Sequence, residues 1–88
     1  MLGWAGRGFV SDKIKQDISI GQNLRRLRKK ARLSQQDVSI KLDLLGLSTS
    51  REIVSRMERG QYSIRVSVLR ALKDIYKVDS YDEFFKDL

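Results

Sequence analysis

The chain has 88 residues, enough for one small domain with a single hydrophobic core. It contains no cysteine and no histidine, which excludes disulfides and thiolate-held metal ions and removes the commonest general base. The formal net charge of +7 is concentrated in residues 21–77, which hold fourteen basic and five acidic side chains and therefore favour an anionic partner, nucleic acid or a membrane surface.

Residues 1–17 are predicted to form an arm separate from the domain that fills residues 18–88. Three glycines and Arg7 interrupt the apolar residues of the arm, so they do not form the run of ~7–15 that marks a signal peptide. Trp4 and Phe9 are apolar enough to seek cover, and the arm is expected either to lack structure or to pack on the domain as a loose helix. Because no apolar run approaches the ~20 residues of a membrane span, we expect a cytoplasmic protein.

The first two helices are predicted from apolar residues that recur at the helical period in a chain without proline. The stripe of the first helix is Ile20, Leu24, Leu27 and Ala31. Ser34 is a favourable N-cap for the second helix, with Asp37 three residues later, and Gly46 suits its C-terminal end. The apolar face of the second helix is Val38, Leu42 and Leu45.

The third helix is predicted within SREIVSRMERG, residues 50–60. Ser50 is its expected N-cap, Thr49 with Glu52 offers a competing capping box, and Gly60 ends it. Only three residues between the two ends are apolar, so this helix buries a narrow side and offers a broad charged side to a partner.

Two further helices are predicted after the loop QYSIRV. The fourth runs from about residue 66 to 77, with its core-facing residues Leu69, Leu72, Ile75 and Tyr76. The fifth begins at Ser80 as N-cap with Glu83 as its capping-box partner, and Phe84 and Phe85 are its apolar anchors. The predicted fold class is therefore all-α.

Three short motifs occur in order along these helices: Leu33-Ser34-Gln35, Ser55-x-x-Glu58-x-Gly60 and Leu69-x-x-Leu72. With them, residues 20–85 resemble the Cro/C1-type (XRE-like) helix-turn-helix domain family. The resemblance implies a compact five-helix, lambda-repressor-like DNA-binding domain whose third helix enters the major groove.

The residues that would contact DNA follow from this geometry. The major groove admits one α-helix, on which arginine can bind guanine through two hydrogen bonds and glutamate can accept one from cytosine. The predicted base-reading residues lie on the third helix: Ser50, Arg51, Glu52, Ser55 and Arg56. The predicted phosphate contacts, to which the resemblance contributes, are Ser34, Gln35, Arg59, Tyr62 and Arg65.

Glu58 is predicted to have a structural role. The resemblance implies an ion pair between this residue and an arginine of the first helix, and the matching position is Arg28. A partly buried carboxylate needs such a partner, because burying it alone costs free energy.

The sequence departs from the family pattern in three places. Arg32 stands where a glycine usually ends the first helix, and a left-handed arginine costs ~1–2 kcal/mol more than glycine, so we expect a differently built turn. The segment DLLGL, residues 43–47, makes the Ser34–Gly60 interval about five residues longer than usual, and we expect it to add a turn to the second helix and to lengthen the loop. Ile53 replaces a small polar residue and could contact a thymine methyl group.

The leading hypothesis is a sequence-specific DNA-binding transcriptional regulator, and more narrowly a repressor. The alternative from another class is an antitoxin-like or adaptor module that binds protein, which a large apolar patch on the reading face would favour. A third hypothesis, RNA or nonspecific nucleic-acid binding, would require aromatic stacking platforms. An enzyme is not expected, because no acid pair or glycine-rich phosphate loop compensates for the missing histidine.

The predicted partners are a double-stranded DNA operator and a second copy of the chain. A weak homodimer is expected through residues 80–88, where the chain is acidic and Tyr81, Phe84 and Phe85 are apolar; the alternative is that both phenylalanines cover the domain's own core. The arm is the next candidate for the interface. No cofactor, metal ion, small-molecule ligand or membrane partner is predicted.

Overall fold

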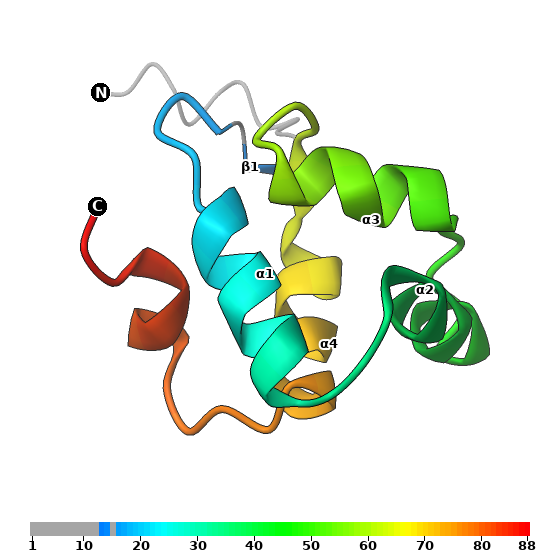
Figure 1. The fold of residues 1–88 in the computed structure, drawn as a ribbon. Helices are drawn as coiled ribbons and strands as arrows, with labels where there is room; N and C mark the ends of the chain where they lie inside the picture. The colour runs from blue at the N-terminus through cyan, green and yellow to red at the C-terminus, as the bar shows by residue number, and fades with distance from the viewer. Residues whose placement is uncertain (1–12, 15) are drawn as a thin grey trace, which may run out of the picture.

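The computed structural model describes residues 13–14 and 16–88, and within them the chain forms four α-helices and one 3-10 helix (Figure 1). The α-helices are α1 (Gly21–Lys30), α2 (Gln35–Leu44), α3 (Arg51–Glu58) and α4 (Val66–Ile75), and the 3-10 helix is η2 (Tyr81–Phe85). The prediction of an arm over residues 1–17, with Trp4 and Phe9, lies largely outside the described residues. None of the described helices is long and apolar enough to cross a membrane.

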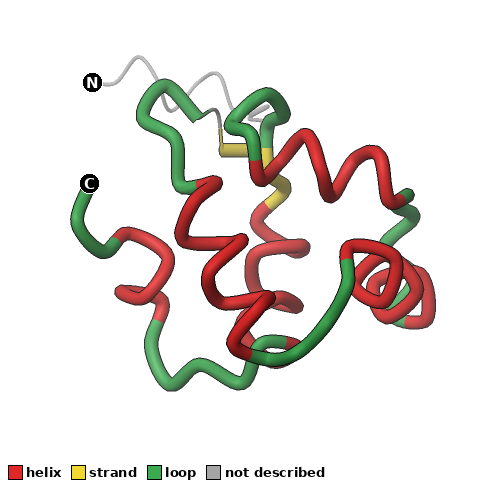
Figure 2. The backbone as a smooth tube through the Cα atoms, in the orientation of Figure 1, coloured by secondary structure: helices red, strands yellow, loops and turns green. Residues whose placement is uncertain are grey.

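Two short strands join the N-terminal segment to the start of α4 (Figure 2). β1 (Lys13–Ile14) pairs antiparallel with β2 (Ile64–Arg65), and Lys13 lies opposite Arg65. The predicted loop between α3 and α4 therefore contains an extended stretch, and the fold is mostly helical rather than purely helical.

The core lies where α1, α2, α3 and α4 meet. α1 packs against α3 and η2, while α2 packs against α3 and α4, so α1 stands between η2 and α3 (Figure 1). The largest fully buried side chains come from every one of these elements: Leu24, Leu27, Val38, Leu42, Val54, Ile64, Leu72 and Phe84. The two C-terminal phenylalanines have different environments, because Phe84 is fully buried and Phe85 is 46% exposed.

A helix lies at the predicted place with the predicted N-cap, Ser80, but it is a 3-10 helix of five residues and not an α-helix. The backbone N–H of Glu83 donates to the carbonyl of Ser80, three residues earlier, as in a 3-10 turn. The hydroxyl of Ser80 accepts from the N–H of Asp82 and not from that of Glu83, so the predicted capping box does not form. Glu83 instead pairs with Arg26 on α1.

All four α-helices end in the same way, with a left-handed residue after the C-cap: Arg32, Gly46, Gly60 and Lys77. After α1, the N–H of Arg32 donates to the carbonyl of Lys29 and the N–H of Leu33 donates to that of Arg28, which is the Schellman motif. The expectation that Arg32 requires a differently built turn is therefore wrong. The two hydrogen bonds, and a cation at the negative end of the helix dipole, offset the strain of a φ of 61°.

The connection between α2 and α3 places one predicted core residue outside the core. Leu45 is 59% exposed, and Leu47 is the residue that packs against the core. The reason is the left-handed Gly46, whose turn ends α2 at Leu44 before Leu45 can continue the apolar stripe. Segment 43–47 therefore supplies the last helical residues, the turn and one core contact.

The N-caps of α2 and α3 are the predicted ones, Ser34 and Ser50. The hydroxyl of Ser50 accepts a hydrogen bond from the N–H of Ile53 at 3.2 Å. The competing box between Thr49 and Glu52 does not form, because the N–H of Thr49 donates to the carboxylate of Asp43 on α2 at 2.9 Å.

Candidate nucleic-acid interface

A groove of about 540 Å³ lies between α3, the N-terminus of α2 and the side of α1. Four of its nine lining residues are arginines and one is a glutamate, so the groove carries excess positive charge. The residues that line it are Arg25, Arg28, Ser34, Gln35, Gln36, Arg51, Ser55, Glu58 and Arg59. We refer to it below as the basic groove.

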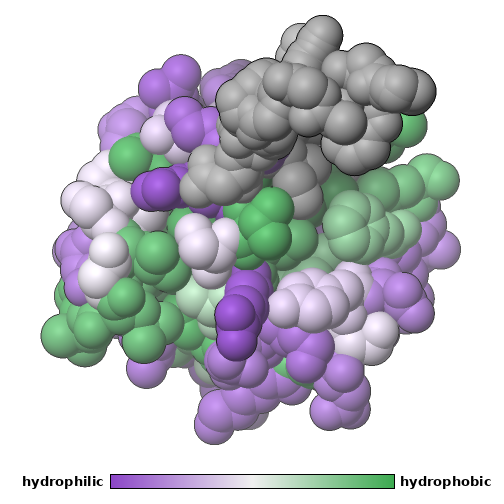
Figure 3. Space-filling model, turned by 180° about the vertical axis from the view of Figure 1, so that it is seen from behind, coloured by the Kyte–Doolittle hydropathy of each residue, from purple (hydrophilic) through white to green (hydrophobic). Residues whose placement is uncertain are grey.

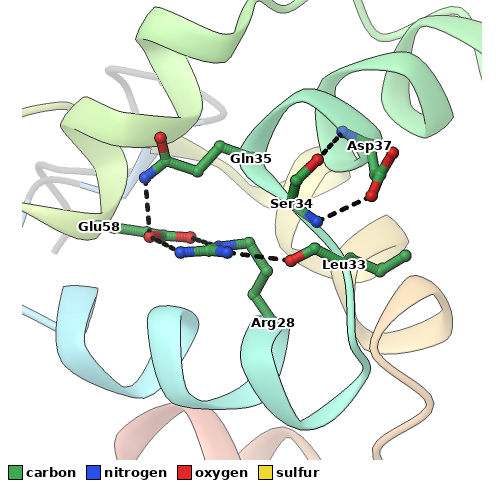
Figure 4. A network of polar contacts seen from close by, with 6 residues as sticks. All are labelled: Arg28, Leu33, Ser34, Gln35, Asp37 and Glu58. Atoms are coloured by element: carbon green, nitrogen blue, oxygen red, sulfur yellow. Dashed lines mark hydrogen bonds and ion pairs between the residues drawn. The ribbon is translucent and has the colours of Figure 1, made fainter.

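A buried ion pair forms the floor of the basic groove (Figure 4). Arg28 donates from Nε to Oε2 of Glu58 at 2.7 Å and from Nη2 to Oε1 at 3.1 Å, so the predicted contact is confirmed. The Arg28 side chain is 10% exposed and that of Glu58 is 4% exposed. The hydrogen bond with Glu58 raises the pKa of Arg28 above its ordinary value.

Two further contacts join this pair to the α1–α2 turn and to α2. Nε2 of Gln35 donates to Oε1 of Glu58 at 3.1 Å, and Nη1 of Arg28 donates to the carbonyl of Leu33 at 2.9 Å (Figure 4). One carboxylate thus accepts from side chains of α1 and α2, and it fixes the relative positions of three helices. The sequence did not predict this contact of Gln35, whose Oε1 points away from Glu58 (Figure 4).

A capping box holds the N-terminus of α2 at the edge of the groove. Ser34 accepts through its hydroxyl from the N–H of Asp37 at 3.0 Å, and its own N–H donates to the Asp37 carboxylate at 2.9 Å (Figure 4). The backbone N–H of Ser34, and after it the Ser34 side chain, lower the pKa of the Asp37 carboxyl below its ordinary value. The hydroxyl of Ser34 accepts in the box and retains its own hydrogen as a donor.

The predicted base-reading residues divide between different sides of α3. Arg51 and Ser55 line the basic groove, whereas Glu52 does not, although it is exposed to solvent as Arg51 is. Arg56 is exposed, and its guanidinium carbon lies 5.6 Å from the centre of the Tyr62 ring. Ser50 serves as the helix cap.

The predicted phosphate-contacting residues lie on both flanks of α3. Ser34, Gln35 and Arg59 line the basic groove. Tyr62 and Arg65 line a second depression of about 360 Å³ on the other side of the helix, whose remaining residues are Lys13, Ser48, Thr49, Ile53, Met57, Ser63 and Val68. Ile53 is half-buried against the core there, and its contact with a thymine methyl group stays a prediction.

The sequence reasoning missed two residues of the basic groove, Arg25 and Gln36. The signal for Arg25 was present, because it precedes Arg28 by three residues and so lies on the same side of α1. Gln36 follows Gln35 in the first turn of α2, where both side chains flank the positive end of the helix dipole.

Three packed helices of which the third is charged and exposed correspond to the class of helix-turn-helix proteins, although the connection between α2 and α3, residues 45–50, is longer than the usual three or four residues. Residues 19–83 match the family model of the helix-turn-helix domain, and the chain belongs to this family. The match agrees with the resemblance to Cro/C1-type domains that the motifs indicate. Comparison with curated proteins and with solved structures gives no significant match.

Proposed function

We propose that the protein is a sequence-specific, double-stranded-DNA-binding transcriptional regulator, acting as a repressor, that inserts α3 into the major groove. The observation that carries the proposal is the basic groove beside α3, with Arg51 and Ser55 on its wall. Membership of the helix-turn-helix family supports DNA as the partner. The DNA-binding unit is residues 18–88, a lambda-repressor-like domain that works in the cytoplasm without a cofactor.

Both flanks of α3 suit this mode of binding. A helix in the major groove lies between two phosphate backbones, so donors are needed on both of its sides. Arg59 and Gln35 offer them from the basic groove, and Tyr62 and Arg65 offer them from the second depression. The buried pair of Arg28 and Glu58 keeps these groups in place and does not itself read DNA.

The first test separates base reading from phosphate contact. We expect selection from random duplexes at fixed salt to enrich one sequence. Arg51→Ala should then weaken the preference at one base pair by ~1–3 kcal/mol, because arginine binds one base edge bidentately. Arg65→Ala should weaken binding to all sequences alike and reduce the dependence of affinity on salt, as loss of a phosphate contact does.

The matched control is Arg70→Ala, an exposed arginine on α4 that lines neither depression, and it should leave affinity and preference unchanged. An equal loss on every sequence for Arg51→Ala would remove its base-reading role. If no sequence is enriched, the proposal of a sequence-specific regulator fails.

We also propose a weak homodimer, formed mainly through residues 80–88. A single recognition helix reads too few base pairs to define a site, and two-fold dimers read half-sites about 34 Å apart. Phe85 and Leu88 are exposed, and both border an apolar depression of about 240 Å³ with Ile18. Figure 3 shows hydrophobic side chains gathered on this side, beside the C-terminal segment.

Sedimentation with and without a palindromic operator tests the dimer. Phe85→Ser should abolish the 2:1 complex and the cooperativity of binding, because it removes an apolar side chain from the interface. Leu45→Ser is the matched control, since it replaces another exposed apolar residue, at the end of α2. Unchanged stoichiometry for Phe85→Ser would place the interface elsewhere, with the arm as the next candidate.

One observation favours the alternative, a protein-interaction module. Ile40 and Leu44 of α2 and the next residue, Leu45, are exposed, and α2 lies on the side of the molecule away from the C-terminus (Figure 1). These residues lie outside the basic groove, so a protein bound there would leave α3 accessible. This second candidate gains weight only if the selection enriches no DNA sequence.

A further inference from the structure

Gln16 connects three parts of the fold through one amide group. Its Nε2 donates to the carbonyl of Met57 at 3.2 Å and to the carbonyl of Tyr62 at 2.8 Å. Its Oε1 accepts from the N–H of Ile20, the residue before α1, at 3.0 Å. The side chain therefore links the start of α1, the last turn of α3 and the loop that follows α3.

Gln16 lies outside residues 19–83, which match the helix-turn-helix family model. It is partly buried, and the pairing of β1 with β2 holds the preceding residues against the start of α4. This segment before α1 is thus attached to the DNA-binding domain at two places, the strand pair and the Gln16 amide.

The junction that Gln16 spans is closely packed. A Cβ atom on Gly21, the first residue of α1, would collide with the backbone of Glu58 at the end of α3. A Cβ atom on Gly60 would collide with the side chain of Ser19. Because the backbones are already in contact, the end of α3 cannot shift freely relative to α1, and the loop after α3 takes its position from this junction.

The loop carries the aromatic ring on which Arg56 lies. Tyr62 is partly buried and packs against the core, and the Arg56 guanidinium lies over its ring at 5.6 Å. An arginine held over an aromatic face gains a cation–π attraction and samples fewer rotamers. A side chain that is already ordered loses less entropy when it binds a partner.

We propose that Gln16 is a positioning residue for DNA recognition, which acts through Tyr62 on Arg56. The Gln16 amide fixes the backbone of Tyr62, and the Tyr62 ring then holds Arg56 in the orientation in which it contacts DNA. This inference rests on the proposed DNA-binding function. It gives the ring of Tyr62 a role that is separate from the phosphate contact of its hydroxyl group.

The first measurement compares Gln16→Met with Gln22→Met. Methionine matches the length of glutamine but neither donates nor accepts as the amide does, and Gln22 is an exposed glutamine on α1. With the selected duplex at fixed salt, Gln16→Met should raise the Kd about three- to tenfold, because it removes all three partly buried hydrogen bonds of the amide. Gln22→Met should leave the Kd unchanged.

A double-mutant cycle with Arg56→Ala distinguishes positioning from general stability. If Gln16 acts through Arg56, Gln16→Met should cost no further affinity once Arg56 is alanine. An equal loss in both backgrounds, or no loss from Arg56→Ala alone, would overturn the inference. Gln16→Glu serves if the methionine variant does not fold, because it keeps the acceptor for Ile20 and removes both donors.

Substitutions of Tyr62 test the same contacts without changing Gln16. Tyr62→Phe keeps the ring and should weaken binding to all sequences alike, whereas Tyr62→Leu removes the ring and should also change the base preference. Identical effects from the two would overturn the role of the ring. If the unmodified chain binds no duplex, the proposed function fails; if it binds and the cycle shows no coupling, only the role of Gln16 fails.

Discussion

Two ion pairs formed by the same helix differ in nearly every respect. Arg28 and Glu58 meet at 2.7 Å, with side chains that are 10% and 4% exposed. Arg26, two residues earlier on α1, meets Glu83 of η2 at 3.5 Å, and these side chains are 42% and 39% exposed. The first pair forms the floor of the basic groove, and the second joins η2 to the opposite side of α1.

The difference shows that the surroundings, and not the residue types, decide what an ion pair contributes. A buried carboxylate must recover its lost hydration, and Glu58 does so through three hydrogen bonds from Arg28 and Gln35. Glu83 keeps water at its carboxylate, so its attraction to Arg26 is weakened by solvent and salt. The buried pair therefore fixes the geometry of the candidate DNA interface, while the exposed pair adds little.

The largest effect is expected for Glu58→Gln. This change keeps the size of the side chain but leaves the buried guanidinium of Arg28 without its charged partner, at a cost of about 3 kcal/mol in the free energy of unfolding. Chemical denaturation measures this loss. Glu52→Gln, an exposed position on the same helix, is the matched control and should change stability by less than about 0.5 kcal/mol.

Sequence preference among the molecules still folded should change little for Glu58→Gln, because this carboxylate is buried and turned toward Arg28. A variant that melts normally yet binds a different sequence would show that Glu58 reads DNA and that its structural role is misassigned.

A smaller effect on the free energy of unfolding is expected at the capping box of Ser34 and Asp37. This box tests whether solvent exposure is enough to make a charged contact weak. Ser34→Ala should cost about 1 kcal/mol, as loss of an N-cap usually does. Asp37 is more exposed than Glu83, yet its two contacts with Ser34 are local and geometrically fixed.

The pH dependence of stability provides the measurement for Asp37. Its pKa in the folded chain lies below the ordinary value of 3.8, so the unfolded chain takes up the proton first. The stabilisation is fully present above the ordinary value and is lost as the pH falls through the folded value. Ser34→Ala keeps the backbone N–H that donates to Asp37, so Asp37→Asn is the variant that should remove this acid-dependent loss, and an unaltered acid profile for Asp37→Asn would mean that the carboxylate of the box contributes nothing.

The smallest effect is expected for Glu83→Gln, at no more than about 0.5 kcal/mol. Raising the salt concentration should remove the difference between this variant and the unmodified chain, whereas it should leave most of the Glu58→Gln difference in place. A loss from Glu83→Gln comparable to that from Glu58→Gln would contradict the comparison between the two pairs.

Contacts between residues close in the sequence were largely predictable. The cap residues Ser34 and Ser50 and the turn glycines Gly46 and Gly60 lie where the pattern places them, because a helix end is decided by hydrogen bonds within a few residues. The turn at Arg32 was predicted wrongly, since residue preference indicated strain but not the hydrogen bonds that offset it.

Of the long-range contacts, the sequence predicted one, between Arg28 and Glu58, through the resemblance to the family. It did not predict that Gln35 also reaches Glu58, that Arg25 lines the groove, or that Gln16 bonds to a loop 46 residues away. Such contacts depend on the angles at which helices pack, which residue types alone do not specify.

By itself, the sequence determined the helical class, the positions of the α-helices, the basic character of the third helix and the family. These properties follow from the period of apolar residues, from caps and from charge, which act over one or two helical turns. Only the tertiary structure decided that Leu47 and not Leu45 enters the core, that Phe84 is buried and Phe85 exposed, and that arginines of two helices meet in one groove. The physical reason is that burial depends on how the helices pack together, and segments far apart in the chain determine that packing jointly.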